Sequence, residues 1–205
     1  TMPDDDLVAQ EIEKLRRRAR LEHIILTSFL NNCTPESSFT THRRNHRQQL
    51  EVTGNSYWEM LRNKAGQLAR FVLIPSSRMR LLPTDGAPVL VTDKVSAGPL
   101  AWDEVQQYRF FRRFVQIVGS HKIFFKEFVD PRVVSRMTGD IYPDLATFKA
   151  KADKGDVPAN EVMHFRIERL GDAYGQPRWV GGLPAVLGAR AADEVNCEYF
   201  DNKAI

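Results

Sequence analysis

Two histidines, His42 and His46, have the spacing of a possible metal site. Residues four apart lie on one face of a helix, so both imidazole rings could bind one divalent cation. No nearby acidic residue completes a zinc-protease pattern, and the sequence indicates no third ligand. The alternative is an ordinary packed or solvent-facing helix face, and we predict no bound metal and no cofactor.

Residues that could support covalent catalysis lack the neighbours that such chemistry needs. Cys33 and Cys197 have no local partner that would activate a thiolate, so we expect reduced, structural thiols. The serine pairs 37–38 and 76–77 do not lie in a nucleophile-elbow pattern. Gly181-Gly182 precedes a predicted helix and could bind phosphate, or it could form a tight loop. We predict that the chain is not an enzyme and has no catalytic residue.

Between residues 108 and 126, aromatic residues alternate with arginines such as Arg109, Arg112 and Arg113. Because aromatic rings stack on bases and arginines contact phosphates, this pattern suggests nucleic-acid binding. The same alternation is typical of a half-buried strand with its aromatic residues inward. His164 lies between apolar neighbours in a short predicted strand, so we expect it to be buried and expect His164→Ala to disturb folding or assembly.

Two helices are predicted before the first strand. Residues 6–31 carry apolar side chains with a period of about 3.6, and acidic residues at their start favour the positive end of a helix dipole. A segment ending in Pro35 breaks this helix. The second helix covers residues 36–52, with Ser37 or Ser38 as its N-cap.

Strands dominate the middle of the chain, and one more helix follows them. Residues 55–61 and 67–74 form a predicted hairpin whose turn contains Gly66. Residues 83–106 give no clear pattern, and residues 139–161 are predicted as a loop with one short helical turn. Further strands are predicted over residues 78–82, 107–118, 122–128 and 162–165, and a helix over residues 183–200. This order predicts an α+β fold with N-terminal helices, a hairpin-rich sheet and a C-terminal helix.

Composition limits the class of protein further. The 205 residues are 42% hydrophobic and 27% charged, which is typical of a globular chain and excludes a disordered or fibrous one. The net charge of +3 is too small to indicate a nucleic-acid binder by itself. Two cysteines exclude a disulfide-stapled scaffold. No apolar run reaches the roughly 20 residues of a bilayer span, and the acidic N-terminus is not a secretory signal.

Three short motifs follow one another over residues 7–205. They are Gly54-Asn55-Ser56-Tyr57 with Arg62-Asn63, Gly66 and Pro75; Phe125-Lys126-Glu127-Phe128 with Asp130-Pro131; and His164-Phe165 with Tyr174-Gly175-Gln176-Pro177, an alanine-rich helix and Phe200-Asp201-Asn202-Lys203-Ala204. In this order and spacing, they resemble the portal proteins of tailed bacteriophages, in the branch of the PBSX-type phage portals.

The resemblance implies that the chain is the N-terminal part of a portal subunit. Residues 1–182 would form most of the wing and residues 183–205 the start of a stem helix, with the clip, tunnel loop and crown absent from this chain. Portal subunits form a ring of about twelve copies at one capsid vertex, and double-stranded DNA passes through it during packaging and ejection. The implied partners are other copies of the chain, the major capsid protein, the terminase large subunit, head-completion or adaptor proteins, and DNA, without a membrane. The implied location is the portal vertex of the virion, after assembly in the host cytoplasm.

The resemblance also suggests contact residues on the predicted helix 183–200. Small side chains let neighbouring helices approach closely, so the expected subunit contacts are Ala185, Ala189, Ala192 and Val195. Arg190 and Lys203 are expected to face the channel or a neighbour. The alternative function is a monomeric α+β nucleic-acid-binding domain that uses the sheet around residues 108–126.

Overall fold

The structure, a computed structural model, describes residues 5–34, 37–96 and 102–202. Its α-helices are α1 (Asp5–Asn32), α2 (Phe39–Thr53), α3 (Leu145–Lys151) and α4 (Leu183–Asp201). Its strands are β1 (Asn55–Arg62), β2 (Leu68–Ile74), β3 (Met79–Thr84), β4 (Val89–Ser96), β5 (Trp102–Arg109), β6 (Arg112–Val118), β7 (His121–Glu127), β8 (Val133–Val134), β9 (Ile141–Tyr142) and β10 (Glu161–Arg166). Two 3-10 helices, η1 (Ser76–Arg78) and η2 (Arg178–Gly182), complete the set. The predicted α+β class is confirmed.

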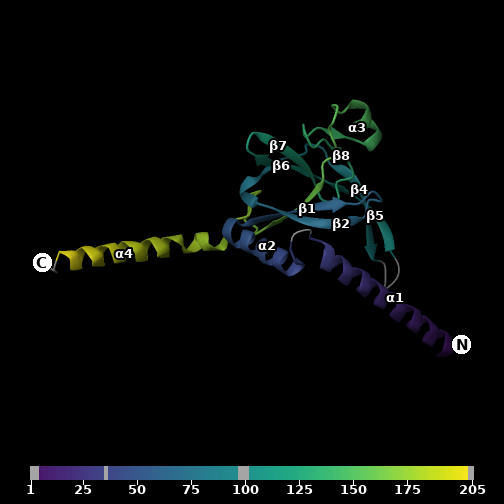
Figure 1. The fold of residues 1–205 in the computed structure, drawn as a ribbon, viewed down its shortest axis with the longest axis horizontal. Coiled ribbons are helices and arrows are strands. Elements are labelled where there is room, and N and C mark those ends of the chain that lie inside the picture. Colours follow the sequence, from purple (N-terminus) through teal and green to yellow (C-terminus); the bar gives the residue numbers. More distant parts are fainter. Residues whose placement is uncertain (1–4, 35–36, 97–101, 203–205) are drawn as a thin grey trace.

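A six-stranded sheet in the order β2-β1-β10-β7-β6-β3 forms the centre of the molecule (Figure 1). Neighbouring strands are antiparallel except β10 and β7, which run parallel and pair only through Glu161 with Lys126 and Val162 with Glu127. One face of the sheet contributes the hydrophobic core, whose buried members are Tyr57, Ile74, Met79, Phe114, Phe125 and Val162.

Helix α2 covers the other face of the β1–β10 part of the sheet. Its N-cap is Ser38, whose hydroxyl oxygen accepts the Thr41 N–H at 3.2 Å. Its C-cap is Gly54, which has a φ of 75° and donates its N–H to the Leu50 carbonyl at 2.8 Å. Because a left-handed cap favours glycine, this single residue ends the helix and starts β1. The predicted cap, helix and following strand are confirmed.

The predicted β1–β2 hairpin is also confirmed. Gly66 in the turn has a φ of 78°. Asn63 closes the turn from both sides, because its N–H donates to the Gln67 carbonyl and its Oδ1 accepts the Gln67 N–H, both at 2.9 Å. The predicted short helical turn after residue 139 is α3, capped by Asp144, whose carboxylate accepts the Thr147 N–H at 2.7 Å.

The prediction of one continuous strand over residues 107–118 is wrong. This stretch contains the end of β5 and the whole of β6, which belong to different sheets. Between them Phe111 is buried, and its carbonyl accepts the Asp85 N–H at 3.0 Å, so the chain turns a corner here. The unassigned segment before it is the β4–β5 hairpin, a separate two-stranded sheet.

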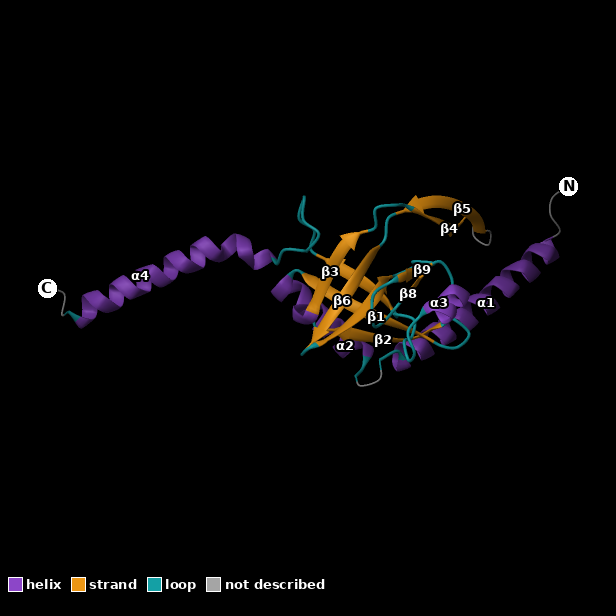
Figure 2. Ribbon diagram, turned by 90° about the horizontal axis from the view of Figure 1, so that it is seen from above, coloured by secondary structure: helices purple, strands orange, loops and turns teal. Residues whose placement is uncertain are grey.

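Helices α1 and α4 extend away from the sheet in opposite directions, so that the first residues of α1 and the last residues of α4 lie far apart (Figures 1 and 2). Neither helix packs along the sheet as α2 does. None of the helices in the described ranges combines the length and the hydropathy that crossing a bilayer requires.

Candidate functional site

Helix α4 has no buried side chain over its whole described length. The N-terminal end of α4 is attached through η2, where Trp179 Nε1 donates to the Val52 carbonyl at 3.2 Å. From there α4 extends away from the sheet (Figure 1). The apolar side chains of Val186 and Phe200 are 65% and 75% exposed. Exposed apolar side chains that gather on one element often mark a surface that binds another molecule. The helix therefore presents apolar surface that no described part of the same chain covers.

The residues predicted to contact neighbouring subunits lie on this exposed helix. Ala185, Ala189 and Ala192 are four and three positions apart, so they share one side of it, and all three are exposed. Val195 lies near the same side and is exposed as well. The structure places these residues where another copy could reach them, and their role as contacts remains a prediction.

Of the two residues predicted to face the channel or a neighbouring subunit, only Arg190 lies in the described part of the chain. Arg190 lies on the opposite side of α4 from the alanines, and its Nε donates to Glu194 Oε1 on the same helix at 3.0 Å. Both side chains are exposed, so the pair leaves Arg190 accessible. Lys203 lies outside the described residues.

Helix α1 is the second projecting element. It is anchored at its C-terminal end, where the Phe29 ring packs edge-on against the Phe71 ring with 5.4 Å between the ring centroids. Just after the helix, the carbonyl of buried Cys33 accepts the Phe71 N–H at 2.7 Å. Before this anchor, Ile24 and Ile25 are more than half exposed. Like α4, α1 has apolar side chains without a cover in the described structure.

His42 and His46 lie in the packed interface between α2 and the sheet. His46 Nδ1 accepts the indole N–H of Trp58 at 2.9 Å and lies 2.8 Å from Ser56 Oγ. Burial lowers the pKa of both histidines. Trp58 thus uses one of the two imidazole nitrogens of His46, and the described residues contain no cluster of three or more potential metal ligands.

The other candidate nucleophiles are dispersed. Cys33 is buried, and burial raises the pKa of its thiol, whereas Cys197 is exposed on α4. Ser38 caps α2, and Ser76 Oγ lies 2.9 Å from Thr53 Oγ1. Gly181 and Gly182 lie at the end of η2, directly before α4.

The structure gives the aromatic residues between positions 108 and 126 different exposures, with Phe124 half-buried. Phe111, Phe114 and Phe125 are buried, as a half-buried strand requires. Tyr108 and Phe110 are exposed at 73% and 58%, beside the corner between β5 and β6. The stretch is therefore no continuous base-stacking platform.

Two motifs that lie far apart in the sequence meet in the structure. A Cβ atom on Gly54 would lie 2.6 Å from the Gly175 carbonyl carbon, and one on Gly175 would lie 2.0 Å from the Gly54 oxygen. The side chain of Asn55 fastens the contact, because its Oδ1 accepts the Gly175 N–H at 2.8 Å and its Nδ2 donates to the Gly175 carbonyl at 3.1 Å. Sequence reasoning noted both glycines without predicting that they touch.

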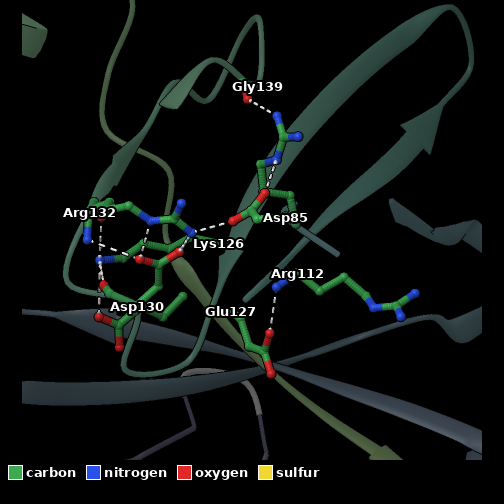
Figure 3. A network of polar contacts seen from close by, with 9 residues as sticks. Asp85, Arg112, Lys126, Glu127, Asp130, Arg132 and Gly139 are labelled. Atoms are coloured by element: carbon green, nitrogen blue, oxygen red, sulfur yellow. Dashed lines mark hydrogen bonds and ion pairs between the residues drawn. The ribbon is translucent and has the colours of Figure 1, made fainter. Parts of the chain in front are cut away.

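A network of charged residues joins β7, the loop after it and the β3–β4 connection (Figure 3). Asp130 is buried, and Arg132 donates to its carboxylate from Nε at 2.9 Å and from a terminal nitrogen at 2.7 Å. Arg132 also pairs with Asp85. Lys126 Nζ donates to the Asp130 carbonyl at 2.7 Å. Paired buried charges of this kind fix one arrangement of a loop, because a lone buried charge is costly.

The fold is thus an α+β domain from which two helices project with exposed apolar side chains. Among curated proteins, the chain is similar to the phage-like element PBSX protein XkdE of Bacillus subtilis, with 34% identity over 75% of this chain and 28% of the relative. It is also similar to the uncharacterized protein YqbA of the same bacterium, with 29% identity over the same shares. The chain is thus related to phage-element proteins and spans about a quarter of the length of these relatives. No family model matches the sequence. No solved structure matches it.

Proposed function

We propose that the chain is the wing and the start of the stem of a phage portal subunit. The proposal rests on the agreement between the sequence motifs and the match to a curated protein. The three motifs resemble PBSX-type portals, and the sequence match leads to a protein of the phage-like element PBSX. The alternative of a monomeric nucleic-acid-binding domain receives no support from the buried aromatic residues of β6 and β7.

The exposed face of α4 agrees with this proposal in physical terms. A contact between two different faces, repeated by rotation, closes into a ring. Ala185, Ala189 and Ala192 would let the next copy of α4 approach closely, and the apolar side chains now in solvent would become buried. The wing sheet would then act as a rigid base for a helix that is ordered by its neighbours.

In this role the chain itself catalyses nothing. The ring, of about twelve copies, would stand at the portal vertex of the virion. It would pass double-stranded DNA and bind the major capsid protein, the terminase large subunit and the head-completion proteins. A mild net charge of +3 suits a channel through which DNA must slide, because many phosphate contacts would hold the DNA in place.

Electron microscopy and sedimentation of the purified full-length protein test the proposal. We expect rings with a central channel and a mass of about a dozen subunits. A stable monomer that binds single-stranded DNA in a salt-sensitive way would overturn the proposal and favour the alternative.

A further inference from the structure

The central sheet splits open between β10 and its neighbour β7. The two strands pair only at Glu161 and Val162, and Phe128 makes the last contact, its N–H donating to the Val162 carbonyl at 3.0 Å. The chain then leaves through a turn that the Asp130 N–H closes on the Glu127 carbonyl at 3.1 Å. Beyond this point the two strands diverge, and a cavity of about 420 Å³ lies in the gap.

The edge of β10 that faces this cavity has free backbone groups. In the antiparallel pairing with β1, Ile167 bonds to Gly54, so alternate residues of β10 turn their N–H and C=O groups toward β1. His164 lies three residues before Ile167, so it belongs to the other set of alternate residues. Its backbone N–H and C=O therefore point away from β1, toward the cavity. Among the described residues neither group has a backbone partner there.

The walls of the cavity are strongly basic. Arg109, Arg112 and Arg166 line it, and Glu127 is the one carboxylate among its described lining residues. Glu127 accepts the backbone N–H of Arg112 at 2.7 Å, while the Arg112 side chain extends away from it (Figure 3). In the described part of the chain, the guanidinium groups of Arg109 and Arg112 make no hydrogen bond and no ion pair. The Arg109 guanidinium carbon lies 5.6 Å from the centre of the Phe111 ring. Burial raises the pKa of the nearby Glu127, and the charges of both arginines act on this carboxyl group with a smaller, lowering effect.

Electrostatics at the cavity agree with this geometry. Burial lowers the pKa of His164 to about 4, and the positive charges of Arg166 and Arg112 add to the effect. The imidazole therefore stays neutral near pH 7, and the arginines supply the positive potential. An anion that enters the cavity would meet two guanidinium groups that have no ion-pair partner within reach among the described residues, that of Arg112 half-buried and that of Arg109 exposed, and charged groups of this kind form charge-assisted hydrogen bonds.

We propose that this cavity binds an acidic, extended peptide segment of a partner protein, which adds as a strand beside His164 and places its carboxylates against Arg109 and Arg112. Strand addition supplies both a donor and an acceptor, which His164 needs, whereas an inorganic anion can only accept. The exposed ring of Phe110 at the rim provides an apolar contact for a side chain of the peptide. The inference does not depend on the portal proposal, since neither the ring nor α4 takes part in it.

Fluorescence anisotropy with a dye-labelled heptapeptide of alternating aspartate and valine tests the inference. We expect saturable binding that weakens about tenfold when Arg109→Gln and Arg112→Gln are combined. Arg70→Gln, at an exposed site on the far edge strand β2, is the matched control and should change the affinity by less than about twofold. Equal binding to the double variant and the wild type would overturn the inference.

Two further arms separate strand addition from plain charge attraction. A peptide of the same sequence with alternate amides N-methylated keeps its charge but cannot pair with an edge, so it should not bind. Amide hydrogen exchange should show that the unmodified peptide protects the His164 N–H. If the methylated peptide binds equally well, or inorganic phosphate at equal charge displaces the peptide, the site is an anion site and the proposal fails.

Discussion

Tyr57 and His164 stack face to face across the β1–β10 ladder, with ring centroids 4.6 Å apart and planes inclined by 8°. His164 Nε2 lies 3.0 Å from Asn55 Oδ1, which also accepts the Gly175 N–H. Since a backbone N–H fixes that oxygen as an acceptor, His164 must donate from Nε2. The hydrogen bond therefore fixes a proton on Nε2, and the ring links the sheet to the loop at Gly175.

The pH dependence of stability follows from this arrangement. The pKa of His164 falls from its ordinary 6.5 to about 4 on folding, mainly through burial. Below pH 6.5 the unfolded chain takes up the proton first, so the free energy of unfolding should fall as the pH falls toward 4. Between pH 7.5 and 5.0 we expect the free energy of unfolding to fall by about 2 kcal/mol through His164, and urea denaturation at the two pH values tests this.

The variant His164→Phe isolates this contribution. This variant keeps a ring against Tyr57 but cannot be protonated, so its free energy of unfolding should depend less on pH. At pH 7.5 that free energy should be about 1 kcal/mol lower than in the wild type, because the hydrogen bond to Asn55 is lost. His42 and His46 have pKa values lowered in the same direction, so some pH dependence should remain. His121→Phe, at an exposed site at the start of β7, should leave the slope unchanged. An unchanged slope in His164→Phe would contradict the assignment.

Gly175→Ala tests the close approach of the two motif glycines. The added methyl group would meet the Gly54 oxygen, which is backbone and cannot move aside like a flexible side chain. We expect a loss of about 2 to 3 kcal/mol in the free energy of unfolding. Gly181→Ala, where nothing lies within 4 Å of the new atom, is the control and should be close to neutral in the same denaturation experiment.

Val129→Gly should stabilise the protein. Val129 is the non-glycine residue in the described chain with a positive φ, 72°, which a β-branched side chain adopts only under strain. The buried Asp130–Arg132 pair beside it holds the turn in place. Relief of the strain, less the added chain entropy of glycine and the lost contacts of a side chain that is only 37% exposed, leaves a gain of less than about 1 kcal/mol. Val157→Gly, a second partly exposed valine, should instead lose stability in parallel melts.

Local chemistry explains which parts of the fold the sequence could predict. Ser38, Gly54, Asn63 and Gly66 act on their own neighbours, so the cap, the helix end and the first hairpin can be read without knowing the rest of the chain. The corner at Phe111 has no such signal. It exists because Phe111 is buried against a loop, with Arg132 over its ring at 5.8 Å, which is a contact between distant segments.

The candidate sites show the same difference between features set by local sequence and features set by contacts between distant segments or chains. Periodicity placed Ala185, Ala189 and Ala192 on one side of a helix, but whether a neighbour covers them depends on a second chain. The cavity beside His164 could not be predicted, because it arises where β7 and β10 stop pairing. The alternation of arginines and aromatic residues did point to this region, although its exposed members, Tyr108 and Phe110, lie at a corner between two sheets.

Leucine substitutions on α4 test the proposed subunit contact. Ala189→Leu and Ala192→Leu each add three carbon atoms to the small-residue side of an exposed helix, where the single chain has room for them. The folded monomer should keep its stability, while ring assembly of the full-length protein should fail because the neighbouring helix can no longer approach. Glu194→Leu places a leucine on the opposite side of α4, beside Arg190, and should assemble normally. Rings from all three variants would remove the alanine side as the contact surface, and loss of rings in Glu194→Leu alone would move the contact to the opposite side.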